Sequence, residues 1–214
     1  MKIGIIGSGD VGRTLASGFI KYGHEVMLGS RDITQEKVQQ WLSGGGKNAS
    51  LGNFTDAAVF GEVVILATPW SGTKNAVDLA GASNFMGKTV IDVTNPLDFS
   101  GGVPPKLAVG MTDSAGEMVQ NWLPGANVVK AFNIVGSSHM INPQFPEGKP
   151  DMFICGNDQK SKETVKSFLD DFGWQTIDLG NIEMSRLLEP LALVWIVYGF
   201  KTNTWAHAFK LLRK

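Results

Sequence analysis

The chain has 214 residues, of which 43% are hydrophobic and 18% are charged, and this composition supports a buried core and excludes an intrinsically disordered protein. The 19 basic and 20 acidic residues give a net charge of −1, without the basic block that a nucleic-acid groove needs. Cys155 is the only cysteine, which excludes an intramolecular disulfide and a cysteine-based zinc site. No apolar run approaches the roughly 20 residues of a membrane-spanning helix, and no signal peptide precedes the first strand. We therefore expect a cytoplasmic protein that binds no metal, nucleic acid or membrane.

Apolar, strand-like runs alternate with segments of helical periodicity along the chain. In the segment 10–22, Leu15 and Phe19 recur at helical spacing, and Gly23 ends the helix. The segment 62–67 is almost continuously apolar, which is typical of a central parallel strand that is buried on both faces. This alternation predicts an α/β fold with a doubly wound, Rossmann-type parallel sheet. Its expected strands span residues 2–6, 24–28, 62–67, 88–93 and 127–132.

A segment with three prolines, 142–150, divides the chain and predicts a linker. We expect a Rossmann domain at 1–150 and a small C-terminal α/β unit at 151–214. A last helix is expected to start at an N-cap, Asn181, and to be interrupted or kinked at Pro190. The other elements expected in the C-terminal unit are strands at 151–155 and 174–179 and an amphipathic helix at 158–172.

The segment 7–12 has the sequence GSGDVG, which fits the pattern G-x-G-x-x-G between a strand and a helix. In such a loop Gly7 allows a tight turn, Gly9 lets the backbone approach a pyrophosphate, and Gly12 lets the helix pack close to the strand. The free N–H groups and the dipole at the helix start attract the anion. The pattern predicts a dinucleotide site, and the alternative is a purely structural turn.

The end of the second predicted strand indicates which dinucleotide binds. An NAD site normally has an acidic residue there, which accepts from the ribose 2′-hydroxyl, whereas this chain has Ser30 and Arg31. A hydroxyl and a guanidinium are donors that suit a 2′-phosphate, and Lys37 adds charge nearby. Alternatively, Asp32 points inward and serves the NAD role. The pattern favours NADP over NAD.

Three later strand ends, at 67–70, 94–97 and 131–134, should line the same crevice, because ligands of doubly wound folds bind beyond the carboxyl ends of the strands. Each pairs an amide or hydroxyl with a rigid or aromatic neighbour, which suits a nicotinamide held flat. Alternatively, these residues only turn the chain. The predicted cofactor-binding residues are Gly7, Ser8, Gly9, Asp10, Val11, Gly12, Ser30, Arg31, Lys37, Ala67, Thr68, Pro69, Trp70, Asn95, Pro96, Phe132 and Asn133.

No motif identifies a catalytic acid, base or nucleophile. The chain has no G-x-S-x-G elbow, no Walker A lysine and no recognisable Ser-His-Asp set. His139 could donate a proton, but a histidine in a loop or in the core is the preferred interpretation. Catalytic residues are therefore left unassigned.

Six pieces of the sequence, spread from Met1 to about Leu193, carry a family resemblance: GSGDVG, GHEVMLGSRD, ATPW, VVKAFN, DMFICGNDQKSKETV and MSRLLEPL. In their ordered combination they resemble the coenzyme F420-dependent NADP oxidoreductases and the cytoplasmic reductase domain of the STEAP metalloreductases. The resemblance implies a Rossmann domain that binds NADPH, a small C-terminal domain, and a flavin or deazaflavin that accepts hydride between them. It also implies that the dinucleotide or its partner touches Ser8, Asp10, Val11, Ser30, Arg31, Thr68, Pro69 and Asn133.

The chain departs from this family in two places. In the deazaflavin-dependent members a histidine stands near the acceptor where this chain has Asn133, and the membrane domain of the metalloreductases is absent. We expect an NADPH-dependent oxidoreductase with a small-molecule, flavin- or deazaflavin-like acceptor, and a homodimer contact near 187–200. The alternatives are a non-catalytic NADP(H)-binding redox sensor and a reductase of a small imine or carbonyl.

Overall fold

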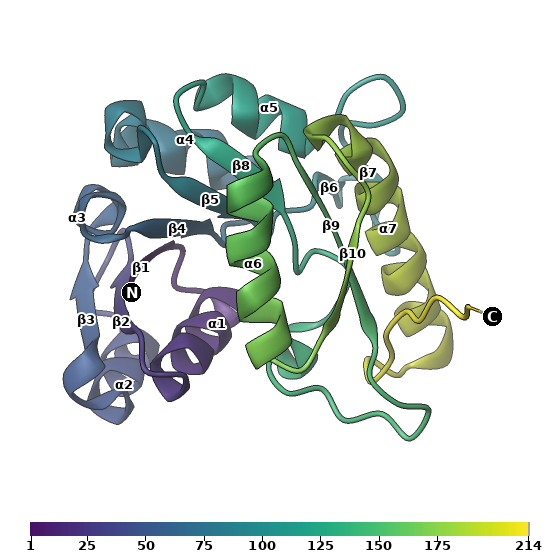
Figure 1. Cartoon of the computed structure of the whole chain (residues 1–214), viewed down its shortest axis with the longest axis horizontal. Helices are drawn as coiled ribbons and strands as arrows, with labels where there is room; N and C mark the ends of the chain where they lie inside the picture. The colour runs from purple at the N-terminus through teal and green to yellow at the C-terminus, as the bar shows by residue number, and fades with distance from the viewer. Residues whose placement is uncertain (214) are drawn as a thin grey trace.

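One eight-stranded sheet runs through the molecule and has helices on both faces (Figure 1). The structure is a computed structural model and describes residues 1–213. The strands of the sheet are β1 (Lys2–Ile6), β2 (Glu25–Gly29), β3 (Ala49–Gly52), β4 (Val63–Leu66), β5 (Thr89–Asp92), β8 (Asn127–Lys130), β9 (Asp151–Gly156) and β10 (Gln175–Asp178). Their order is β10-β9-β8-β5-β4-β1-β2-β3, and only the β8–β9 pair is antiparallel. A separate hairpin pairs β6 (Leu97–Asp98) with β7 (Lys106–Leu107).

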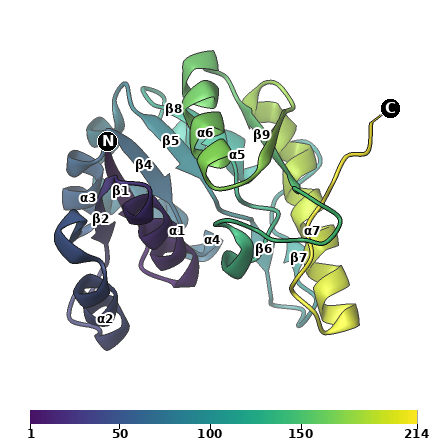
Figure 2. The same ribbon diagram turned by 60° about the horizontal axis from the view of Figure 1, so that its bottom comes forward.

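The helices divide between the two faces of the sheet. One buried apolar cluster joins the sheet to α1 (Asp10–Lys21), α2 (Glu36–Gly44) and α6 (Gln159–Asp171). The other joins it to α3 (Phe54–Phe60), α4 (Trp70–Ala80) and α5 (Ala115–Trp122). The last helix, α7 (Ser185–Thr202), lies beyond β9 and beside the β6–β7 hairpin (Figure 2). These layers confirm the predicted doubly wound α/β fold.

Local sequence explains most element boundaries. All four side chains of β4 are buried, as expected for a central strand covered on both faces. Helix α1 buries Leu15 and Phe19 completely, and the chain turns away after the helix at Gly23, whose φ is +85°. Helix α3 starts in a capping box, in which Asn53 accepts from the Asp56 N–H and the Asp56 side chain accepts from the Asn53 N–H.

The last helical region starts next to Asn181, as predicted. Asn181 is the N-cap residue of a short 3₁₀ turn, Ile182–Met184, but its side chain makes no capping bond, and α7 follows directly at Ser185. Pro190 lies inside α7 without interrupting it. Leu188 and Ala192 are buried on either side of the proline, and this packing offsets the hydrogen bond that proline cannot donate.

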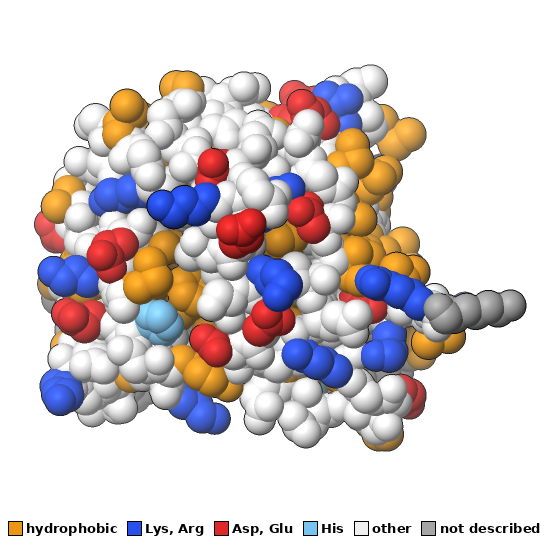
Figure 3. All heavy atoms as spheres, in the orientation of Figure 1, with side chains coloured by type: hydrophobic (Ala, Val, Ile, Leu, Met, Phe, Trp, Pro, Cys, Tyr) orange, Lys and Arg blue, Asp and Glu red, His pale blue; other side chains and the backbone are white. Residues whose placement is uncertain are grey.

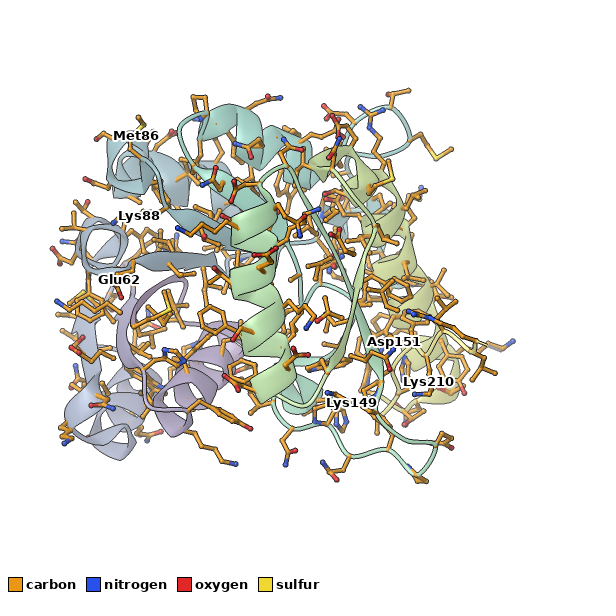
Figure 4. The ribbon with its side chains drawn as sticks, in the orientation of Figure 1. Glu62, Met86, Lys88, Lys149, Asp151 and Lys210 are labelled. Carbon is orange, nitrogen blue, oxygen red and sulfur yellow. The ribbon has the colours of Figure 1, made fainter. Side chains whose placement is uncertain are left out.

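The C-terminal segment extends the sheet. The predicted linker 142–150 contains no helix or strand, and β9 after it pairs with β8, with Lys130 opposite Cys155. The chain after α7 returns to the start of β9. There the Leu211 N–H donates to the Asp151 carboxylate at 2.5 Å, and Lys210 donates to the Lys149 carbonyl at 2.6 Å (Figure 4). Among residues 1–213, no helix combines the length and apolar character needed to cross a bilayer.

Candidate functional site

Parallel register brings four strand ends to one edge of the sheet. Ile6 of β1 pairs with Gly29 of β2 and with Leu66 of β4, and Leu66 pairs with Asp92 of β5. The chain winds in opposite directions on the two sides of β1 and β4, so the crevice beyond them is the topological switch point where such folds bind ligands. Two adjoining cavities, of about 440 and 430 Å³, lie there.

The first cavity lies between the glycine-rich loop and the turns that follow β2 and β4. Its walls carry two cations, Arg31 and Lys37, and no carboxylate among the described residues. It is therefore suited to an anionic ligand. The lining residues are Gly7, Ser8, Gly9, Ser30, Arg31, Gln35, Lys37, Phe54, Ala67, Thr68, Pro69, Ser71, Gly72, Asn75 and Ala76.

The three glycines of the loop have different structural roles. Gly7 has a φ of +120°, and a Cβ there would overlap the Ala67 carbonyl oxygen. A Cβ on Gly12 would overlap the Gly7 carbonyl oxygen, so this glycine allows α1 to pack on the loop. A Cβ on Gly9 would meet no atom within 4 Å, and no side chain caps the helix start that Gly9 precedes. The space beside this helix start is therefore free of protein atoms, as the close approach of a pyrophosphate requires.

Hydrogen bonds hold the turn after β2 against the loop. Ser8 Oγ donates to Ser30 Oγ at 2.9 Å, and Ser30 Oγ donates to the Asp32 carbonyl at 2.9 Å. The Asp32 carboxylate accepts from the Thr34 hydroxyl at 2.6 Å and from the Thr34 N–H at 2.9 Å, and these bonds hold the pKa of Asp32 below its usual value. Asp32 does not line the cavity, so Arg31 is the charged residue of this turn that does.

The second cavity is mainly apolar and adjoins the first across Gly9 and Thr68. Asp10 is the one titratable side chain among its lining residues, and its carboxylate pairs with Arg13 at 2.5 Å. Trp70 forms part of the wall and stacks on Trp122, with ring centroids 5.5 Å apart. The lining residues are Gly9, Asp10, Val11, Ala67, Thr68, Pro69, Trp70, Ser71, Val93, Thr94, Asn95, Leu97 and Phe99. An apolar cavity with a tryptophan in its wall suits a planar ring, and its one acidic side chain, Asp10, is already paired.

Some residues of the predicted cofactor set lie behind these walls. Gly12 and Pro96 are buried, and the Phe132 ring lies in the core, 6.0 Å from the ring of Phe172. Asn133 is also buried, and it exchanges hydrogen bonds of 2.7 and 3.0 Å with Asn95. The structure thus brings Asn133 to the cavity only through Asn95.

Sequence reasoning missed a buried charged cluster close to the second cavity. Lys130 and Asp92 are fully buried, Glu189 is 1% exposed, and the lysine pairs with both carboxylates at 2.8 and 2.9 Å. Burial alone would lower the pKa of Lys130, but the two carboxylates raise it above its usual value. The signal in the sequence was a charged residue within each of two apolar strands, VID and VVK. Neighbouring Cys155 is buried, and burial raises the pKa of its thiol to about 11, which disfavours the reactive thiolate.

Comparisons with known proteins identify the family of this chain. The family described as NADP oxidoreductase, coenzyme F420-dependent, matches residues 2–96. The F420-dependent NADP reductase of Methanocaldococcus jannaschii is 32% identical over 211 residues, which cover 94% of this chain and 93% of that protein. The structure of a candidate F420-dependent NADP-reductase from Arthrobacter sp. FB24 superposes with a TM-score of 0.94 at 39% identity and covers all of both chains.

A more distant relative is longer than this chain. The metalloreductase STEAP3 of Rattus norvegicus is 28% identical over 195 residues, which cover 90% of this chain but only 36% of that protein. The predicted family and the predicted enzyme class are both confirmed. The chain belongs to the coenzyme F420-dependent NADP oxidoreductase family and is an NADP-dependent oxidoreductase.

Proposed function

We propose that the protein transfers hydride between NADP(H) and a flavin- or deazaflavin-like small molecule. The observation that carries this proposal is the pair of adjoining cavities, one cationic at a helix N-terminus and the other apolar and walled by Trp70. The relatives named F420-dependent NADP reductases support a deazaflavin as the acceptor. A tricyclic acceptor needs the same flat, apolar surroundings as the nicotinamide itself.

The first cavity would hold the adenosine half of the cofactor. Arg31 and Lys37 would bind the 2′-phosphate, because a guanidinium and an ammonium both pair well with phosphate oxygens. The open N–H groups that follow Gly9 would bind the pyrophosphate. The nicotinamide would then enter the second cavity, past Thr68 and between Val11 and Trp70.

The protein would catalyse the transfer chiefly by positioning the two rings. Bound NADPH supplies the hydride, and the protein's side chains hold the donor and acceptor rings in contact. Val11, Pro69 and Trp70 would keep the nicotinamide flat and exclude water from its face. The acceptor ring can take its proton from solvent, and the pairing of Asp10 with Arg13 agrees with a site that has no dedicated acid.

The test is to mix the protein with NADPH and a panel of flavin, deazaflavin, ferric, cyclic imine and carbonyl acceptors and to follow the nicotinamide absorbance. The proposal expects oxidation with a flavin or deazaflavin, and no oxidation when Gly9→Leu protein replaces the wild type. Binding of NADPH without oxidation by any acceptor would support a redox-sensing module instead. Oxidation only by cyclic imines or carbonyl compounds would support the third function, a reductase of such compounds.

We also propose a homodimer that forms through α7. Figure 3 shows hydrophobic side chains gathered over this helix, and Leu187, Val194 and Tyr198 are 62%, 58% and 50% exposed. An apolar face of this kind is typical of an interface between protein chains. Light scattering at micromolar concentration should give the mass of two chains, and the mass of a single chain would contradict the dimer.

A further inference from the structure

The buried cluster of Asp92, Lys130 and Glu189 ends at the wall of the second cavity. Besides its two carboxylate partners, which lie 2.8 and 2.9 Å away, Lys130 Nζ donates to the Thr94 carbonyl at 2.8 Å, so three oxygens surround the ammonium. Asp92 Oδ1 accepts from the Thr94 N–H at 2.9 Å and from the Thr94 hydroxyl at 2.7 Å. Three hydrogen bonds, one from Lys130 and two to Asp92, therefore hold Thr94 in place.

Helix α7 supplies the third member of the cluster. Glu189 Oε2 accepts from the Ala115 N–H and Oε1 from the Gly116 N–H, both at 3.0 Å, at the start of α5. The positive end of the α5 dipole therefore offsets part of the net negative charge of the cluster. Glu189 thus connects α7 to two elements at once, the start of α5 and, through Lys130, the end of β5.

A second connection runs from α7 to the same wall. The Leu188 carbonyl accepts from Asn133 Nδ2 at 3.1 Å, and the same amide donates to Asn95 Oδ1 at 3.0 Å. Asn95 and Thr94 are consecutive residues that line the second cavity. Adjacent residues of α7 therefore reach adjacent residues of the wall, one through Asn133 and the other through Lys130.

We infer that Glu189 and Lys130 are positioning residues, which set the place of the Thr94–Asn95 wall and through it the place of the nicotinamide. The inference rests on the proposed function, because it takes the second cavity to hold the nicotinamide. A buried ion pair adds little stability compared with an apolar group of the same shape. What it supplies here is a fixed geometry at Thr94, and a reacting ring needs its supports held to within a fraction of an ångström.

The test compares Glu189→Gln with a matched control, Arg186→Gln. Arg186 also joins α7 to α5, since it pairs with Glu117 at 2.8 and 2.5 Å, but it lines neither cavity. Dissociation constants are measured by calorimetry for NADPH, which would fill both cavities, and for adenosine 2′,5′-bisphosphate, which would fill only the first. The ratio of the NADPH constant to the bisphosphate constant reports on the binding of the nicotinamide half, because a general loss of folded protein changes both constants alike.

We expect Glu189→Gln to weaken NADPH binding by about tenfold, equal to about 1.4 kcal/mol, and to leave the bisphosphate constant within twofold of wild type. Arg186→Gln should lower the unfolding midpoint and leave both constants unchanged. If Glu189→Gln alone does not fold, the double variant Lys130→Met, Glu189→Gln is used, because it removes one charge of each sign. The ratio of its NADPH constant to its bisphosphate constant should be higher than the wild-type ratio. A folded variant whose ratio matches wild type would overturn the positioning role alone, whereas a wild type that binds no NADPH would overturn the proposed function with it.

Discussion

The hydroxyl of Ser8 donates a hydrogen bond of 2.9 Å to the hydroxyl of Ser30, which joins the glycine-rich loop to the end of β2. Ser30 donates its own proton to the Asp32 carbonyl, and it is only 4% exposed. Its hydroxyl is therefore used to hold the turn. In the proposed site, therefore, Ser30 would shape the turn, and Arg31 would supply the charge for a 2′-phosphate.

Gly9 should be the position at which a side chain blocks the cofactor without disturbing the fold. Gly9→Leu should unfold with a free energy within about 1 kcal/mol of wild type, because an N-cap substitution has effects of that size. Its Cβ would meet no atom of the protein, and the added side chain would fill the space of the pyrophosphate. Calorimetric titration should detect no NADPH binding.

Gly12→Leu is the matched contrast within the same loop. Its Cβ would overlap the Gly7 carbonyl oxygen, so α1 cannot stay packed on the loop. This variant should unfold at lower temperature or fail to accumulate as folded protein. Equal NADPH affinity in Gly9→Leu and in wild type would mean that the pyrophosphate of the cofactor does not bind at this loop.

His24 should make the protein less stable as the pH falls. It packs edge-on against Phe19 and Phe168, with centroids 5.5 and 5.3 Å away. Burial, followed by the nearby N-terminal ammonium, lowers its pKa below the ordinary 6.5, while Asp171 opposes the shift. The unfolded chain then binds a proton more readily than the folded chain. The stability that neutral His24 contributes is therefore complete above the pKa of the unfolded chain, and it is lost as the pH falls from there toward the pKa of the folded chain.

His24→Phe should remove this part of the pH dependence, since phenylalanine keeps the aromatic packing and takes up no proton. Urea denaturation at about pH 7.5 and about pH 5.5, on either side of the ordinary histidine pKa, measures the difference. Wild type should lose more unfolding free energy between the two conditions than the variant does. Equal losses would show that His24 has the same pKa in the folded and unfolded chains.

His139 should be dispensable for turnover. Its ring lies against Phe145 with centroids 5.4 Å apart, and it lines neither cavity. With an acceptor that supports oxidation of NADPH, His139→Ala should keep most of the wild-type kcat. A general acid typically contributes about a hundredfold to ten-thousandfold, so a loss on the order of a thousandfold with NADPH affinity intact would establish a proton donor and favour the imine or carbonyl reductase.

The sequence predicted those features that local patterns determine, such as the buried strand β4 and the glycine-rich turn. It did not predict the cluster of Lys130 and Glu189, because these residues are far apart in the chain and meet only when α7 packs on the sheet. The sequence pattern also did not predict the direction in which side chains point at the strand ends. Phe132 follows a strand end as predicted, but its φ of +61° accompanies a ring that lies in the core.

The most direct test of NADP(H) use at this site is the affinity of Arg31→Ala for NADPH and for NADH, measured beside Ser30→Ala. A charge-assisted hydrogen bond contributes about 1.5–3 kcal/mol, so Arg31→Ala should weaken NADPH binding by about one to two powers of ten and leave NADH nearly unchanged. Ser30→Ala should weaken both cofactors alike, because Ser30 supports the turn rather than the phosphate. Equal losses of NADPH and NADH affinity in Arg31→Ala would contradict the proposed phosphate site.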